Sequence, residues 1–122
     1  MSFALVIDDN RQTADALCQM LDFLNVPTRV AYGASSAISI LGSITPRLIL
    51  LDINMLGVDG FEILAYLRRE PRLVPVPVVV ITSDDQPETK ARVMEGGAQA
   101  LIIKPATLES LEAALKSASI VE

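Results

Sequence analysis

The sequence predicts an α/β protein in which helices cover both faces of a parallel sheet, a doubly wound three-layer sandwich. Five short apolar runs alternate with five segments whose apolar residues recur at helical spacing. Two of the runs, residues 48–51 and 78–81, are apolar throughout, which is typical of central strands buried on both faces of a parallel sheet. Right-handed crossovers between parallel strands then place helices on both faces.

The strands and helices follow one another in strict alternation. The strands are expected at residues 3–7, 28–32, 48–51, 78–81 and 100–103. The helices are expected from stripes of apolar residues, which are Ala14, Leu17, Cys18, Leu21 and Leu24 in the first; Ala34, Ala37, Ile38 and Leu41 in the second; Phe61, Leu64 and Leu67 in the third; Ala91 and Met94, with Val93 as a further candidate, in the fourth; and Leu108, Leu111, Leu115 and Ala118 in the fifth.

The residues around these stripes are suited to helix ends. Three of them, Asn10, Asp59 and Thr107, are expected to cap the first, third and fifth helices. The fourth helix has the weakest stripe. Its predicted ends are a capping box formed by Asp85 and Glu88, and a left-handed exit at the two glycines 96–97.

The composition bounds the class of protein. A chain of 122 residues, 51% of them hydrophobic, suits one compact domain, which we assign to residues 1–122. The net charge of −5 argues against direct binding of nucleic acid by this chain. Its apolar runs are far shorter than the roughly 18 residues of a membrane span. Asp8, Asp9 and Arg11 interrupt any secretion signal, so we expect a cytoplasmic protein without membrane contact.

Two residue types exclude further classes of protein. The chain contains no histidine, which excludes serine–histidine catalysis and histidine metal sites, and any phosphohistidine in the mechanism must belong to another protein. Cys18 is the single cysteine, which excludes an internal disulfide and a cysteine zinc cluster. Its position on an apolar stripe favours a role in packing over a reactive thiol.

Polar residues stand where four of the apolar runs end. Asp8 and Asp9 follow the first run, Asp52 the third, Thr82 the fourth and Lys104 the fifth. The carboxyl ends of parallel strands meet at one edge of a sheet, where open α/β sheets bind their ligands. We therefore expect these side chains to converge there. Each has a simpler explanation alone, as a turn or a helix cap, but their joint placement favours a site.

Three carboxylates, one hydroxyl and one ammonium group suit a divalent cation and a phosphoryl group. A carboxylate such as that of Asp52 can attack phosphorus and form an acyl phosphate. Mg²⁺ prefers oxygen ligands, so we expect Asp9 and Asp52 to bind it directly and Asp8 through water; Mn²⁺ or another divalent cation suits the same ligands. Lys104 supplies a positive charge for a phosphate oxygen, and Thr82 supplies a hydroxyl donor.

Several stretches of the chain together resemble the receiver domains of two-component response regulators. They are Val6-Ile7-Asp8-Asp9-Asn10, the segment 46–55 (PRLILLDINM) followed by Asp59-Gly60-Phe61-Glu62, the segment 77–83 (PVVVITS), and the segment from Gly96-Gly97-Ala98 to Ile103-Lys104-Pro105. The resemblance covers the whole chain. It implies a flavodoxin-like (βα)5 fold with strand order 2-1-3-4-5 and a cis peptide bond between Lys104 and Pro105.

The resemblance also implies residue roles and partners. Asp52 would be the phosphorylation site, contacted through its phosphoryl group by Thr82 and Lys104. Mg²⁺ would be held by Asp8, Asp9, Asp52 and the main-chain carbonyl of Asn54. A sensor histidine kinase or a histidine phosphotransfer protein would donate the phosphoryl group, and the domain would slowly hydrolyse it. The face around the fourth and fifth helices would then engage an unknown downstream protein, with the domain a monomer or a weak dimer through these helices.

Three residues depart from the family pattern. Leu56 stands where proline is usual, Ser83 replaces a small apolar residue, and Leu101 replaces an aromatic that swings inward on activation in many members. Our leading hypothesis is a phosphoacceptor switch that is not a turnover enzyme. The alternative, which Leu101 favours, is a receiver-like interaction module that works without phosphorylation. A dehalogenase-type aspartyl phosphatase ranks last, because Asn54 stands where that class requires a second acid.

Overall fold

The computed structural model describes residues 2–120, and in this part of the chain five strands alternate with five helices. The strands are β1 (Ala4–Ile7), β2 (Thr28–Ala31), β3 (Leu48–Asp52), β4 (Val78–Thr82) and β5 (Ala100–Ile103). The helices are α1 (Arg11–Phe23), α2 (Ala34–Leu41), α3 (Gly60–Arg69), α4 (Pro87–Glu95) and α5 (Leu108–Ser117). Among residues 2–120, none of the helices has the length and hydrophobicity needed to cross a membrane.

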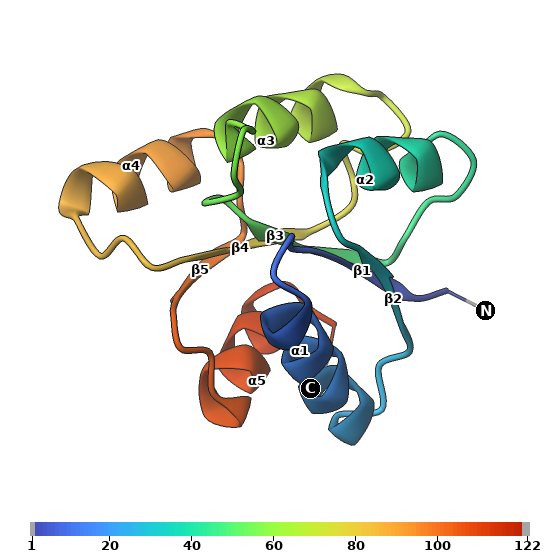
Figure 1. The fold of residues 1–122 in the computed structure, drawn as a ribbon, viewed down its shortest axis with the longest axis vertical. Coiled ribbons are helices and arrows are strands. Elements are labelled where there is room, and N and C mark those ends of the chain that lie inside the picture. Colours follow the sequence, from blue (N-terminus) through green and yellow to red (C-terminus); the bar gives the residue numbers. More distant parts are fainter. Residues whose placement is uncertain (1, 121–122) are drawn as a thin grey trace.

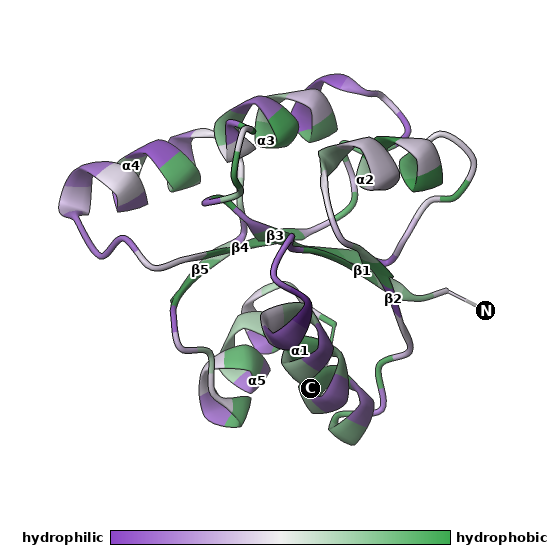
Figure 2. Ribbon diagram, viewed as in Figure 1, coloured by the Kyte–Doolittle hydropathy of each residue, from purple (hydrophilic) through white to green (hydrophobic). Residues whose placement is uncertain are grey.

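All strand pairs are parallel, and the strands lie in the order β2-β1-β3-β4-β5. Helices α1 and α5 cover one face of this sheet, and α2, α3 and α4 cover the other (Figure 1). Successive residues of β1 alternate between two cores: Ala4 and Val6 pack with α1 and α5, whereas Leu5 and Ile7 pack with the other three helices. Figure 2 shows hydrophobic strands between helices of mixed character. The predicted fold class and strand order are confirmed.

The strand register brings the carboxyl ends of the central strands level with one another. Asp52 is paired with Ile81, and Thr82 is paired with Ile103. These are the last pairs of their ladders, and both polar residues end their strands. Strands β3 and β4 are thus one residue longer than predicted, because the ladder includes these polar residues. β1 begins one residue later and β2 ends one residue earlier than predicted.

The three predicted side-chain caps are confirmed. The side chains of Asn10, Asp59 and Thr107 accept hydrogen bonds from the backbone N–H groups of Thr13, Phe61 and Ser110, respectively. The left-handed exit from α4 is made by Gly97, whose φ is 97°, whereas Gly96 keeps a right-handed φ of −72°.

Helix α4 begins differently from the prediction, and the expected capping box of Asp85 and Glu88 is wrong. The residue that caps the helix is Gln86. The carboxylate of Asp84 accepts hydrogen bonds from Gln86 N (2.9 Å) and Thr89 Oγ1 (2.6 Å). Asp84 lies two residues before Gln86, the spacing at which an aspartate side chain closes a turn, so it takes the place that Asp85 was expected to fill.

Helix α4 is lightly attached to the rest of the domain. Val93 is its one buried side chain, in a helix that lies wholly within the described residues. Of the three residues named for its stripe, Val93 is buried as predicted, whereas Ala91 and Met94 are wrong, because Ala91 is exposed and Met94 is 42% exposed. The guanidinium of Arg92 stacks over the ring of Phe61 in α3, 3.7 Å from its centroid. One apolar side chain and one cation–π contact therefore carry much of its attachment to α3 and the core.

The other predicted stripes differ from the structure in single residues. Ile38 and Leu108 are exposed, although the spacing predicted that both would face the core. Ile63 and Ala114 are buried but were left out of the predicted stripes. Cys18 is half-buried, in keeping with a role in packing.

Candidate functional site

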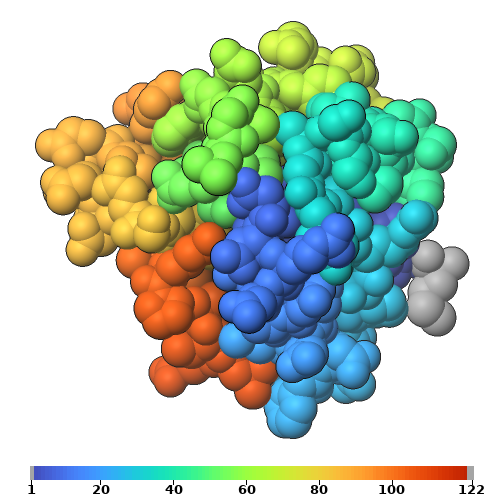
Figure 3. All heavy atoms as spheres, in the orientation of Figure 1, coloured from blue at the N-terminus to red at the C-terminus, as the bar shows by residue number. Residues whose placement is uncertain are grey.

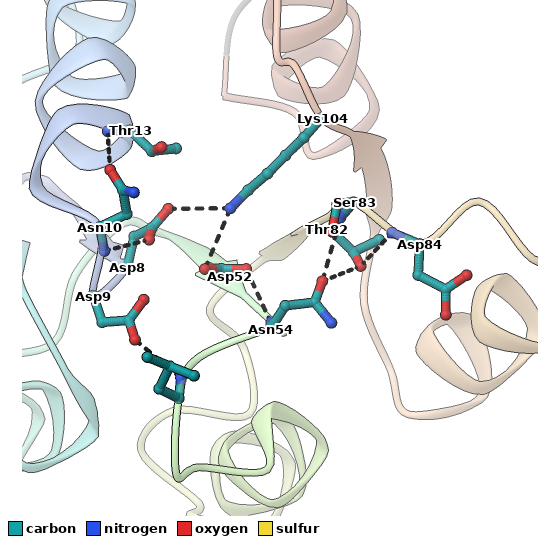
Figure 4. Close-up of polar contacts among 11 residues, drawn as sticks. Asp8, Asp9, Asn10, Thr13, Asp52, Asn54, Thr82, Ser83, Asp84 and Lys104 are labelled. Carbon is teal, nitrogen blue, oxygen red and sulfur yellow. Dashed lines mark hydrogen bonds and ion pairs between the residues drawn. The ribbon is translucent and has the colours of Figure 1, made fainter.

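The carboxylates of Asp8 and Asp52 are buried where β1 and β3 end side by side (Figure 4). Each gives one oxygen to the backbone that follows it. Oδ1 of Asp8 accepts a hydrogen bond from Asn10 N (2.9 Å), and Oδ1 of Asp52 accepts one from Asn54 N (3.0 Å). These two bonds fix both side chains at the edge of the sheet, as the strand-end pattern predicted.

Asp9 is exposed and connects the loop after β1 with the loop after β3. Its Oδ2 accepts a hydrogen bond from Leu56 N (3.0 Å). The side chain of Leu56 is 91% exposed, so the contact is made by its backbone alone. One carboxylate oxygen from each of Asp8, Asp9 and Asp52 lies within 4.8 Å of the others. The structure therefore brings the three predicted carboxylates together.

Lys104 reaches into the same site from the loop after β5. Its Nζ lies 3.3 Å from Oδ2 of Asp52 and 3.7 Å from Oδ2 of Asp8. The peptide bond between Lys104 and Pro105 is cis, as the family resemblance implied. Figure 3 shows this edge as a surface, on which segments from the start (blue), the middle (green) and the end (orange) of the chain adjoin one another. The site is thus assembled from residues distant in sequence.

Burial raises the pKa of Asp8 from 3.8 to about 6. The N–H group of Asn10 opposes the rise in pKa, the negative charge of Asp52 adds to it, and the positive charge of Lys104 opposes it. Burial dominates because the side chain is removed from the water that would otherwise solvate its charge. Three carboxylates and one ammonium group meet at this site, so the formal charge of the site is negative.

These residues fit a divalent cation. Oδ2 of Asp8 is buried, and among residues 2–120 it has no hydrogen-bond partner. A buried polar atom without a partner is unfavourable, and three converging carboxylates repel one another unless a cation compensates them. The donors are all oxygens, the type of ligand that Mg²⁺ and Ca²⁺ prefer.

Thr82 lies at the same edge, but its hydroxyl is engaged with the loop after β3. Thr82 Oγ1 donates a hydrogen bond to Oδ1 of Asn54 (2.5 Å) and accepts one from Asp84 N (3.1 Å). Ser83 N also donates to Oδ1 of Asn54 (3.2 Å). The prediction included the main-chain carbonyl of Asn54 but missed its side chain. An amide two residues after a strand-end aspartate was the available signal.

Comparison of the sequence with models of known protein families identifies its family. A model of the response regulator receiver domain matches residues 4–116. The chain belongs to this family. The receiver domain identified from the motifs of the sequence is therefore confirmed, with the predicted site residues at the edge where the motifs meet.

Known relatives of this receiver domain include transcriptional regulators. It is 31% identical over 113 residues to the phosphate regulon transcriptional regulatory protein PhoB of Escherichia coli, covering 93% of this chain and 49% of PhoB. The chain thus spans about half the length of that relative.

Two solved structures are also similar. The signal receiver domain of a DNA binding response regulator from Colwellia psychrerythraea has a TM-score of 0.87 and 28% identity, with 95% of this chain and 96% of that chain covered. A response regulator from Burkholderia pseudomallei, with a phosphorylated aspartic acid, a calcium ion and citrate, has a TM-score of 0.85 and 28% identity, with 98% and 69% covered.

Proposed function

We propose that this receiver domain, taken as one unit over residues 1–122, is a phosphoacceptor switch. In this proposal Asp52 takes a phosphoryl group from a phosphohistidine on a sensor histidine kinase or a histidine phosphotransfer protein. The observation that carries the proposal is the position of Asp52, which is buried at the end of β3 with Oδ2 3.3 Å from Lys104 Nζ. The similar Burkholderia protein, which has a phosphorylated aspartic acid and a calcium ion, supports the same chemistry here.

The transfer exchanges one bond to phosphorus for another. A carboxylate oxygen of Asp52 bonds to phosphorus as the phosphorus–nitrogen bond of the donor breaks, and the imidazole leaves with the electron pair. Lys104 compensates negative charge on a phosphoryl oxygen. Mg²⁺, held by Asp8, Asp9, Asp52 and the main-chain carbonyl of Asn54, would supply further compensation for the incoming charge. Slow hydrolysis, in which water attacks phosphorus and releases phosphate, restores the carboxylate.

A groove beside the site suits a protein donor. It has a volume of about 460 Å³ and runs between α1 and the loop after β5. Lys104 lines it together with Thr13, Ala16, Met20 and Pro105. The apolar side chains give a partner surface to bury, and Lys104 connects the groove with the acidic site. We propose that the donor protein docks here, with its phosphohistidine directed at Asp52.

The test is intact mass spectrometry after incubation with a small acyl-phosphate donor, with and without Mg²⁺. The wild-type chain is expected to gain the mass of one phosphoryl group only with Mg²⁺, and Asp52→Asn is expected to gain none. Asp59→Asn is the matched control, because it removes an exposed carboxylate from the same loop and keeps a good helix cap. It should be phosphorylated like the wild type.

Two outcomes would contradict the proposal. Phosphoryl transfer to Asp52→Asn would place the acceptor elsewhere. A wild-type chain that takes no phosphoryl group, either from the small donor or from a cognate kinase, would favour the alternative function, an interaction module that works without phosphorylation. Leu101 favours that alternative, because it is half-buried against the core where many family members have a mobile aromatic.

Lys104→Ala tests how the phosphoryl group is read. We expect Asp52 still to be phosphorylated, at a lower rate, while the shifts of the α4 amides on phosphorylation become smaller, because a phosphoryl oxygen loses its positively charged partner. NMR spectra before and after phosphorylation measure both. Lys116→Ala, which removes an exposed charge near the far end of α5, is the control. Unchanged α4 shifts in phosphorylated Lys104→Ala would refute this role.

A further inference from the structure

The side chain of Asn54 joins the two loops that flank the acceptor. Its Oδ1 accepts hydrogen bonds from Thr82 Oγ1 (2.5 Å) and Ser83 N (3.2 Å) in the loop after β4. Its backbone N–H is bonded to Asp52 Oδ1 (3.0 Å), which fixes Asn54 relative to the acceptor. Figure 4 shows the carboxamide between Asp52 and Thr82. Asn54 is therefore in contact with both the acceptor and the loop that leads to α4.

The hydroxyl of Thr82 has one proton, and Asn54 receives it. Thr82 is buried, with 0% of its surface exposed, so its hydroxyl requires a protein acceptor. Its oxygen in turn accepts from Asp84 N (3.1 Å). A phosphoryl oxygen on Asp52 can receive the same proton only after the bond between Thr82 and Asn54 is broken. The two acceptors therefore exclude each other.

This exchange is coupled to the start of α4 through Asp84. The N–H group of Asp84 donates a hydrogen bond to the Thr82 oxygen, so this bond depends on where that oxygen lies. The carboxylate of Asp84 accepts hydrogen bonds from Gln86 N (2.9 Å) and Thr89 Oγ1 (2.6 Å). A rotation of the Thr82 side chain that moves this oxygen therefore acts on the residue that organises the entry to α4. Because Val93 is the one buried side chain of this fully described helix, little core packing resists its displacement.

We propose that the Asn54 carboxamide is a positioning residue that holds the loop after β4, and with it α4, in the unphosphorylated arrangement. Competition between Asn54 and the phosphoryl group for the Thr82 proton sets how readily α4 moves. This inference rests on the proposed phosphorylation of Asp52 and assigns its regulation to the side chain of one neighbouring residue. Asn54 itself is exposed, so its replacement leaves the core intact.

The test compares the unphosphorylated full chain with Asn54→Ala by NMR. Without Asn54, the Thr82 side chain is expected to turn toward the acidic site, and the amides of Asp84, Gln86 and Thr89 to shift toward their positions in the phosphorylated wild type. Loss of one hydrogen bond corresponds to an increase of about 5-fold in the population of that arrangement, equivalent to about 1 kcal/mol. Asn54→Asp keeps an oxygen acceptor for Thr82 and should leave the amides of α4 near their wild-type positions.

A double mutant separates this role from a general structural effect. In a Thr82→Val background the proton is absent, so Asn54→Ala should add a much smaller shift in α4, because only the hydrogen bond from Ser83 N is then lost. The inference is overturned if the α4 amides of Asn54→Ala keep their wild-type positions, or if Asn54→Ala shifts them equally with and without the Thr82 hydroxyl. Phosphoryl uptake by the wild type is measured separately by mass, so failure of the proposed function is distinguished from failure of this inference.

Discussion

Asp8→Asn is expected to make the metal-free protein more stable than the wild type at pH 7.5, by up to about 3 kcal/mol. The pKa of Asp8 is raised from 3.8 to about 6 in the folded protein, mainly by burial. At about 1.4 kcal/mol per pKa unit, this shift corresponds to the stated difference. The folded state holds the proton more tightly than the unfolded state, so stability from this group is lost as the pH rises from about 4 through 6. Asparagine is uncharged and avoids this loss.

Urea unfolding in a chelator at pH 4.5 and pH 7.5 measures the effect. The stability advantage of Asp8→Asn over the wild type should be small at pH 4.5 and large at pH 7.5. Asp59→Asn is again the control and should change stability little at either pH, because asparagine caps a helix as well as aspartate does. Addition of Mg²⁺ should stabilise the wild type more than Asp8→Asn, because binding to the folded state adds to its stability. A variant less stable than the wild type at pH 7.5 without metal would refute this account.

Gly60→Ala is expected to destabilise the protein by about 1–3 kcal/mol. A Cβ atom at Gly60 would lie 2.6 Å from both the Cα and the carbonyl oxygen of Ile53. Both are backbone atoms of the residue between Asp52 and Asn54, so the clash can be relieved only by moving the loop after β3 or the start of α3. We therefore also expect the Asn54 amide to shift and phosphorylation of Asp52 to slow.

Gly33→Ala is the matched control for this substitution. A Cβ at Gly33 would have no atom within 4 Å, and its φ of 169° is extended backbone that alanine adopts. We expect a change within about 0.5 kcal/mol and unchanged phosphorylation. Urea unfolding and NMR of both variants measure the contrast. Equal stabilities for the two variants would show that the close approach of Gly60 to Ile53 is not required.

The fold could be predicted from the sequence because hydrophobic periodicity is a local signal. The uninterrupted apolar runs of β3 and β4 indicated buried parallel strands, and the polar residue ending each run indicated the edge where the site would form. Asp8, Asp52 and Lys104 converge as predicted. Periodicity was less reliable in the fourth helix: of the residues named for its stripe, Met94 is exposed and Val93 is buried.

The features that could not be predicted from the sequence depend on contacts of the loops at the edge of the sheet. Asn54 is an exposed loop residue, and its side chain gains importance only because the loop after β4 lies beside it. Asp85 and Glu88 match the spacing of a capping box, but Asp84 closes the turn first. In each case two arrangements suit the local sequence, and contacts between segments distant in the chain select one.

The order of the site residues along the chain has a consequence for the protein during its synthesis. The acidic residues after β1 lie early in the chain, Asp52 ends β3, and Lys104 follows β5, so the last of these groups arrives only when most of the chain has been made. A nascent polypeptide that has not yet added its fifth strand lacks Lys104, the charge partner of Asp52. Under the proposed function, the site would then be complete only after the fifth strand has been made.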